Sequence, residues 1–408
     1  MACRIWGQAL PHWINGLRVD PVSKRTITTK IDTLLAAWLC NETKEIAGVE
    51  FDTHYDKILE RVDFHGIAGL IYSQPSLTSR MPETLRLALR DRAIIRLIWE
   101  KNHARMLERL LPMLVGTGRP PLQFKGTALA YSLYADPAAR TRGDTDILVA
   151  DDTFDSSTRV LRDQGFITPM TSGGEIISIE KTFIFTDTTG LEHHIDLHRK
   201  LSNSIVLAKL FTYEELLERS VVLPGLGPAA RALGMVDALL IACMHRMVHL
   251  GSPYYVNDAT YFSADRLIWL YDIHLLASEF SERDWGDFLT LAKQKGLMEI
   301  AGNGLGAAQN ALMTDIPADV LNKLDQTHQR ETPAKYLGAQ PWQQMVMNFF
   351  AIHDPGRKIQ FLREVAFPPA RYMRLQFAHI RPAWLPWLYC SRAFSGIWKL
   401  VRPRGGYK

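Results

Sequence analysis

Residues 124–149 read FKGTALAYSLYADPAARTRGDTDILV, and this stretch decides the fold. A Lys-Gly turn precedes a helix-sized segment, and an Asp-x-Asp pair then runs into an apolar stretch typical of a β-strand. Alternation along a strand directs Asp144 and Asp146 to the same face. Adjacent carboxylates repel each other unless a cation lies between them, although an Asp-x-Asp pair alone also suits a turn. Because Mg²⁺ joins carboxylates to substrate phosphates, the pair predicts a metal and phosphate site.

A third carboxylate comes from the sequence LEHHIDLHRK at residues 191–200. Alternation on this predicted strand places four polar side chains on one face: Glu192, His194, Asp196 and His198. Asp196 has apolar neighbours on both sides, so we expect a buried carboxylate that needs a cation or hydrogen-bond donors. Together with Asp144 and Asp146 it could ligate two metal ions. Such a pair of ions activates an attacking oxygen and stabilises a leaving pyrophosphate.

The histidines allow several interpretations. The pattern E-x-H-x-D-x-H also suits zinc or another transition metal, while His194 and His198 could instead be structural, or contact substrate or a metal-bound carboxylate. His245 and His249 lie four residues apart on a predicted helix, without the glutamate of the zinc-protease pattern. We expect them to pack internally, or His245 to reach the substrate cleft. Asp272 could pair with one of the two.

The glycine turn supplies candidates for phosphate binding. Gly126 would let backbone N–H groups approach a phosphate, and Thr127 would begin a helix whose N-terminus favours anions. Lys125 could neutralise phosphate charge or be a surface lysine at the end of a strand. Arg140 and Arg142 could bind phosphate with forked donors or be solvated loop charges.

Composition sets the limits on function. The chain has 408 residues, of which 47% are hydrophobic and 22% charged, as in ordinary globular proteins. A formal net charge of +4 without a long basic run does not favour nucleic acid as a partner. Four widely spaced cysteines without metal-ligand spacing indicate reduced, buried thiols. No secretory core or long apolar stretch is present, so we expect a cytoplasmic protein without a membrane span.

The pattern along the chain predicts an α+β fold, with a small mixed β-sheet core between N-terminal and C-terminal helical regions. We expect four parts: helical residues 1–115, the core at 116–204, a helical domain at 205–366 and a basic, aromatic tail at 367–408. Strands are predicted at 122–124, 146–150, 176–186 and 191–199, and helices at 31–114, 127–134, 152–164, 229–250, 263–278 and 284–295. Within 83–114 we expect an inward apolar stripe, formed by Leu85, Leu87, Leu89, Ile94, Ile95, Leu97, Ile98, Met106, Leu107 and Leu110.

The tail contains an amphipathic pattern. Its apolar face would hold Trp387, Cys390, Phe394, Ile397, Trp398 and Val401, and its basic positions are Arg392, Lys399 and Arg402. Such a helix either rests on an anionic membrane surface or packs on its own protein.

Taken together, the motifs resemble the nucleotidyltransferase superfamily of DNA polymerase beta. Within it, Lys-Gly-x-Ala-Leu-Ala, Asp-x-Asp-Ile-Leu-Val and His-x-Asp-Leu-His resemble an uncharacterised bacterial nucleotidyltransferase family, most specifically over residues 124–199. The resemblance implies that Gly126 and Thr127 form the phosphate-binding turn and that Asp144, Asp146 and Asp196 bind metal. The interval of 18 positions from Gly126 to Asp144 (144 − 126) is longer than in many members of the superfamily.

These observations predict a metal-dependent enzyme that uses Mg²⁺ or Mn²⁺ to move a nucleoside monophosphate (NMP) from a nucleoside triphosphate (NTP) to an acceptor, releasing pyrophosphate. Asp144, Asp146 and Asp196 would be catalytic, and Lys125, Gly126 and Thr127 would hold the β- and γ-phosphates. Two alternatives remain open at this point. The same pocket could transfer a phosphoryl group, or the chain could be a non-catalytic nucleotide-binding partner of a biosynthetic complex. The acceptor could be a small molecule, a peptide or a protein.

Overall fold

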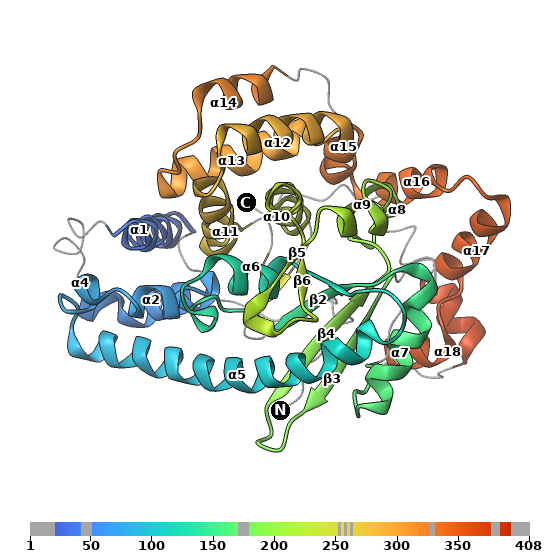
Figure 1. Cartoon of the computed structure of the whole chain (residues 1–408), viewed down its shortest axis with the longest axis horizontal. Helices are drawn as coiled ribbons and strands as arrows, with labels where there is room; N and C mark the ends of the chain where they lie inside the picture. The colour runs from blue at the N-terminus through green and yellow to red at the C-terminus, as the bar shows by residue number, and fades with distance from the viewer. Residues whose placement is uncertain are drawn as a thin grey trace.

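The computed structural model describes residues 21–41, 51–169, 179–251, 254–256, 259–261, 264–326, 331–376 and 384–392. A six-stranded mixed β-sheet lies at the centre, with helices on both faces (Figure 1). The predicted α+β class is therefore confirmed. In the described residues, no helix has the length and apolar character that a membrane crossing requires.

The predicted N-terminal helical run forms five helices: α1 (Pro21–Leu39), α2 (Phe51–His65), α3 (Ala68–Tyr72), α4 (Pro75–Thr78) and α5 (Glu83–Val115). Pro75 occupies the first position of α4, where its missing N–H leaves no hydrogen bond unmade. Leu34, Trp38, Ile58 and Leu89 are fully or almost fully buried in one apolar cluster. This cluster joins the first five helices to α11 (Leu267–Ser278) and α13 (Met298–Leu312).

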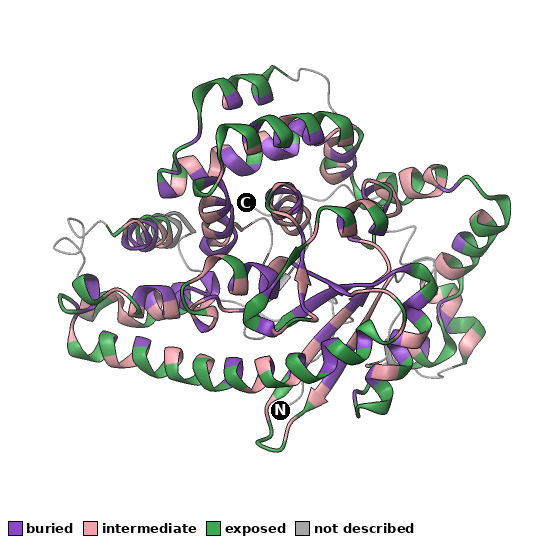
Figure 2. Cartoon of the chain, viewed as in Figure 1, coloured by how far each residue is buried: buried purple, intermediate pink, exposed green. Residues whose placement is uncertain are grey.

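The predicted apolar stripe of α5 is wrong in its middle. Leu85, Leu89, Leu107 and Leu110 are buried, but the outer surface of the helix carries four exposed apolar residues: Ile94, Ile95, Leu97 and Ile98 (Figure 2). At this level the buried positions are Trp99, Glu100 and His103. They are spaced for one helix face and lie behind the end of the sheet that carries the aspartates. Polar partners, and not apolar ones, decide which side of α5 faces inward there.

The sheet has the strand order β3-β4-β2-β1-β6-β5. Its strands are β1 (Leu122–Phe124), β2 (Asp144–Leu148), β3 (Glu180–Thr186), β4 (Glu192–His198), β5 (Val221–Val222) and β6 (Arg231–Ala232). β2 begins two residues earlier than predicted, so both residues of the Asp-x-Asp pair lie on the strand. β5 and β6 lie beyond residue 204, where the sequence predicted only helices, and β6 pairs in parallel with β1. The predicted division into four parts stays a prediction.

The two faces of the sheet have different covers. Ile147, Val149 and Ile195 pack with leucines of α5 and with α7 (Phe154–Asp163). Phe124 and Leu148 face the other way and share a core with α10 (Met235–Leu250), α12 (Glu282–Lys295) and α13. Because Leu148 has the same strand parity as the two aspartates, the carboxylates lie on the face toward the C-terminal helices.

Three of the remaining helices lie between strands of the sheet: α6 (Lys125–Leu133) follows β1, and α8 (Ile205–Ala208) and α9 (Tyr213–Glu218) follow β4. The others come after the sheet in sequence: α14 (Ala318–Asp325), α15 (Thr332–Gly338), α16 (Pro341–Ala351), α17 (Pro355–Ala366) and α18 (Ala370–Gln376). A two-stranded hairpin of β7 (Tyr254–Val256) and β8 (Ala259–Tyr261) follows α10. Thr212 and Ser281 begin α9 and α12 with reciprocal capping boxes, which satisfy backbone N–H groups at both N-termini.

The C-terminal tail tests two predictions only in part. Trp387 is exposed, while residues 393–408, which include most of the predicted amphipathic face, lie outside the described residues. Cys390 is exposed and Cys40 half-buried, so the expectation of buried thiols holds for Cys243 but is wrong for these two. Cys3 also lies outside the described residues.

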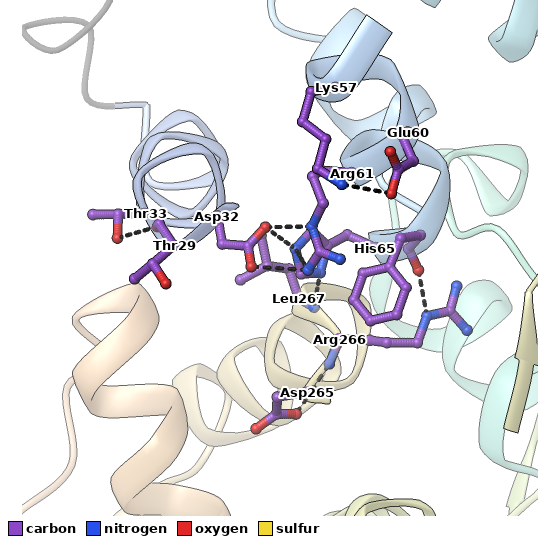
Figure 3. A network of polar contacts seen from close by, with 11 residues as sticks. Thr29, Asp32, Thr33, Lys57, Glu60, Arg61, His65, Asp265, Arg266 and Leu267 are labelled. Carbon is purple, nitrogen blue, oxygen red and sulfur yellow. Dashed lines mark hydrogen bonds and ion pairs between the residues drawn. The ribbon is translucent and has the colours of Figure 1, made fainter. Parts of the chain in front are cut away.

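An ion-pair cluster fixes α1 and α2 to the start of α11 (Figure 3). Arg61 donates two hydrogen bonds to Asp32, at 2.6 and 2.8 Å, and its guanidinium lies 4.0 Å from the centre of the Phe64 ring. Nδ1 of His65 accepts a hydrogen bond from the backbone N–H of Leu267, so Nε2 carries the proton and donates to Asp32 at 3.0 Å. We call Asp32, Arg61 and His65 the helix clamp.

Candidate active site

Strand register brings the predicted carboxylates together. β2 and β4 run in parallel, with Asp146 opposite Asp196 and Asp144 opposite His194. Residues opposite each other on adjacent strands project to the same face, so the pairing of the two strands, and not sequence proximity, builds the site.

Three side chains form the tightest group. Ligand atoms of Asp146, Asp196 and His198 all lie within 4.8 Å of one another. Nε2 of His198 lies 2.9 Å from Oδ1 of Asp146, and its Nδ1 lies 3.4 Å from Glu180. Asp144 is on the same face, at the exposed end of β2, and is not part of this group of three. We call Asp146, Asp196 and His198 the sheet cluster.

The sheet cluster holds more negative charge than the fold neutralises. Burial, followed by the charges of Asp144 and Asp146, raises the pKa of Asp196 to about 7. Oδ1 of Asp196 is buried and has no hydrogen-bond partner among the described residues. Burial would raise the pKa of Asp146 as well, but Lys125 and His198 lower it below its ordinary value. A buried carboxylate oxygen without a donor fits a site that a cation completes.

Lys125 has an unusual backbone at the junction of β1 and α6. Its φ is +54°, in the left-handed region that residues other than glycine rarely adopt. Its Nζ lies 2.7 Å from Oδ1 of Asp146. Burial would lower the pKa of Lys125, but the charge of Asp146 raises it, so the ammonium group stays charged. Strain of this kind often marks a functional turn.

Gly126 is required by close packing. A Cβ atom there would lie 2.9 Å from a guanidinium nitrogen of Arg140. Arg140 is itself buried and donates to both carboxylate oxygens of Asp272, at 2.9 and 2.5 Å, while Tyr134 donates to the same carboxylate. Asp272 therefore ties α11 to the loop before β2, and this tie uses the guanidinium that was predicted to bind phosphate.

Thr127 and Arg142 belong to a buried network behind the carboxylates. Nε of Arg142 donates to the Thr127 hydroxyl at 2.9 Å, and its other end pairs with Glu100 at 2.6 Å. The Thr127 hydroxyl also lies 2.7 Å from that of Thr145, which contacts His103 at 2.6 Å. The side chain of Thr127 is thus already bonded within the protein. Its backbone N–H, in contrast, belongs to the first turn of α6, where N–H groups have no partner within the helix.

The remaining predicted histidines lie around the sheet cluster. His194 is half-buried, 3.6 Å from Glu192. His245 stacks edge-on with His249 at 4.4 Å and with Trp269 at 5.8 Å, both measured between ring centroids. Burial holds the pKa of His245 well below its usual range, so this imidazole is neutral.

Sequence reasoning missed Glu180 and Glu100. Glu180 could have been found by counting outward from the hairpin turn, because the register that sets Thr186 opposite Glu192 also sets Glu180 opposite His198. Glu100 gave no comparable signal. Its burial depends on α5 meeting Arg142, a contact between residues 42 positions apart.

The donor set fits a divalent metal ion. Two carboxylates suit Mg²⁺ or Mn²⁺, whereas an imidazole as third ligand suits Mn²⁺ or zinc better than Mg²⁺. His198 can otherwise keep its hydrogen bond to Asp146 and orient that carboxylate.

Residues 52–313 match a protein family described as uncharacterised nucleotidyltransferase. The chain belongs to this family. The match runs from α2 to α13 and so includes the whole sheet and every carboxylate of the candidate site. As a nucleotidyltransferase, the protein is a transferase of phosphorus-containing groups, and the family implies an NTP substrate. A comparison with curated proteins found no match.

Proposed function

We propose that the protein transfers an NMP from an NTP to an acceptor hydroxyl, in a metal-dependent reaction that releases pyrophosphate. The observation that carries this proposal is the register of β2 and β4, which sets Asp146 beside Asp196, one of whose buried oxygens has no hydrogen-bond partner among the residues that the structure describes. Family membership supports the same class of reaction.

The proposed roles follow from position. Asp146 and Asp196 would hold the metal, with Asp144 at the open end of β2 completing the set toward the nucleotide. When bound, the metal supplies charge neutralisation for the phosphates. The acceptor oxygen forms a bond to the α-phosphorus as the bond from that phosphorus to the bridging oxygen breaks. Pyrophosphate leaves with the electron pair, and Asp196 takes the acceptor proton.

Phosphate binding would use the turn into α6. Lys125 and the backbone N–H groups of Gly126 and Thr127 lie at the N-terminus of this helix, which favours anions. Lys125 would exchange its contact with Asp146 for one with the β- or γ-phosphate once a metal neutralises Asp146. Arg140 and Arg142 are paired with Asp272 and Glu100, so we propose that they serve the nucleotide by fixing α6 in place.

Other parts of the proposal concern the metal ion, the nucleotide, the location of the protein and two histidines. Mg²⁺ and Mn²⁺ are the proposed ions and ATP the first NTP to test. A cytoplasmic location and contact of the C-terminal helix with an anionic membrane remain predictions. We propose His194 and His198 as contacts to substrate or to Asp146.

The test is incubation of the protein with each NTP and Mg²⁺ or Mn²⁺, using label on the α- or γ-phosphate. The proposal expects labelled pyrophosphate from the γ-label, and a mass increase of one NMP on the protein or on an added acceptor. Release of a nucleoside diphosphate would instead indicate phosphoryl transfer. If nucleotide binds without any turnover, the protein is a non-catalytic partner.

A further inference from the structure

A cavity of about 190 Å³ lies where three helices meet. α6, α10 and α11 each give it one face, and these helices converge beside the sheet (Figure 1). On α10 the lining positions are Met235, Ala238, Ile241, Ala242 and His245, which have the spacing of a single helix face. Most of the remaining wall is apolar, as at Leu129.

The cavity shares two residues with the surroundings of the sheet cluster. Lys125 lines it and contacts Asp146 at 2.7 Å, and Phe124 lines it while its ring centroid lies 4.9 Å from that of His198. A ligand at this end of the cavity is therefore separated from the carboxylates by one side chain. Two other lining residues, Val221 and Met235, are exposed, which gives the cavity a route to solvent.

Three polar side chains of the wall, Arg140, Asp272 and Ser132, already have hydrogen-bond partners. Arg140 and Asp272 bond to each other, and the hydroxyl of Ser132 donates to the carbonyl of Ala128. A nucleobase needs free donors and acceptors along its edge, and these groups do not offer them. An apolar group needs none, and a void of about 150 Å³ already holds benzene. His245 also lines the cavity, and its neutral imidazole can form a hydrogen bond with a hydroxyl group of a ligand.

We infer that this cavity binds the apolar part of the acceptor, a group about the size of a single aromatic ring, whose hydroxyl points toward Lys125 and Asp146. The inference rests on the proposed NMP transfer and adds a substrate class to it. Small alcohols with an apolar group are then preferred over equally small polar ones, because burying the ring removes apolar surface from water.

The experiment uses the full chain with 2-phenylethanol as the apolar probe and ethylene glycol as the polar one. Calorimetry without nucleotide measures binding to the wild type, to Ala238→Leu and Ala242→Leu, which fill the cavity from two positions, and to Ala318→Leu. Ala318 is exposed on α14 and is the matched control. We expect 2-phenylethanol to bind the wild type and Ala318→Leu, and to bind both filled variants at least about tenfold more weakly.

A second arm adds NTP and Mn²⁺ and measures the NMP ester of each alcohol. The wild type and Ala318→Leu should form the 2-phenylethanol ester faster than the ethylene glycol ester, and the filled variants should lose this preference. Equal affinity in wild type and both filled variants would overturn the inference, as would displacement of 2-phenylethanol by a nucleoside. Esters formed equally from both alcohols would also overturn it, yet leave NMP transfer intact. Absence of any ester and of pyrophosphate would count against the proposed function, whatever the binding arm shows.

Discussion

The sheet cluster and the helix clamp are built from the same kinds of group, yet they differ in whether their carboxylates have enough hydrogen-bond donors. Each places an aspartate beside a histidine and a cation: Asp146, His198 and Lys125 on the sheet, Asp32, His65 and Arg61 between the helices. In the clamp, hydrogen bonds from His65 and Arg61 outweigh the effect of burial and lower the pKa of Asp32. The single carboxylate of the clamp therefore has hydrogen-bond donors for both of its oxygens.

The sheet cluster contains a second carboxylate, Asp196, which forms no hydrogen bond through its buried oxygen within the described part of the chain. Burial and the neighbouring carboxylates raise the pKa of this Asp196 side chain to about 7. In the helix clamp the carboxylate has its donors, whereas in the sheet cluster the carboxylates exceed the donors. A bound metal ion would neutralise this excess negative charge. The comparison therefore separates an ion pair that stabilises the fold from a cluster whose groups are kept for binding and chemistry.

The largest expected effect is on catalysis. Asp196→Asn removes the proposed proton acceptor and metal ligand, and should lower NMP transfer on the order of 10²- to 10³-fold. Asp32→Asn should leave the rate per folded molecule within a factor of about two, because the clamp lies outside the site. Pyrophosphate release at saturating NTP measures both. Equal losses in the two variants would contradict the separation of roles.

The next effect is on stability and is expected in the reverse order. Asp32→Ala leaves Arg61 buried without its partner, which should reduce the free energy of unfolding by about 3 kcal/mol. In the metal-free protein, Asp196→Asn relieves repulsion among the carboxylates and should not destabilise the fold. Urea denaturation measures both, and Asp319→Ala, which breaks an exposed pair with Lys323, is the control expected to leave stability unchanged.

Metal binding should distinguish the regions by thermal or urea unfolding. At about 100 times its Kd, Mg²⁺ or Mn²⁺ should raise the free energy of unfolding of the wild type by about 2.7 kcal/mol. The same increase is expected in Asp32→Asn and none in Asp196→Asn. An undiminished increase in Asp196→Asn would place the metal elsewhere.

The smallest effect, taken per pH unit, is the pH dependence of stability, where the two regions have opposite signs. Asp196 has a native pKa of about 7 against an ordinary value of 3.8, so in the metal-free protein its contribution falls as pH rises between these values. Burial lowers the native pKa of His65 below 6.5, so its contribution falls as pH drops below 6.5. Each slope is at most about 1.4 kcal/mol per pH unit.

Single variants separate the two slopes. Urea denaturation between pH 5 and 7.5 should show the falling slope removed in Asp196→Asn and the rising slope removed in His65→Gln. The reverse assignment would mean that the pKa of each group is shifted the other way.

The fold class and the alternation of β4 could be predicted from the sequence, because strand parity and turn residues are local signals. The placement of His198 beside Asp146 could not, since it depends on the register of two strands about 50 positions apart. Residues of two-residue strands such as β5 show no periodicity, which explains why this edge of the sheet was missed.

The interpretation of Arg140, Arg142 and Thr127 shows the same limit. Their residue types suit phosphate, but the structure pairs them with Asp272, Glu100 and Thr145, which lie on other elements. Local sequence identifies a chemical group, whereas burial and partner decide whether that group is available to a ligand.

The most direct test of the central claim is release of pyrophosphate from γ-labelled NTP, with Mn²⁺ or Mg²⁺, by the wild type, Asp196→Asn and Asp32→Asn side by side. We predict labelled pyrophosphate from the wild type and Asp32→Asn, and loss of nearly all of it in Asp196→Asn and in the metal-free wild type. Undiminished release by Asp196→Asn, or labelled orthophosphate or nucleoside diphosphate in place of pyrophosphate, would contradict the account.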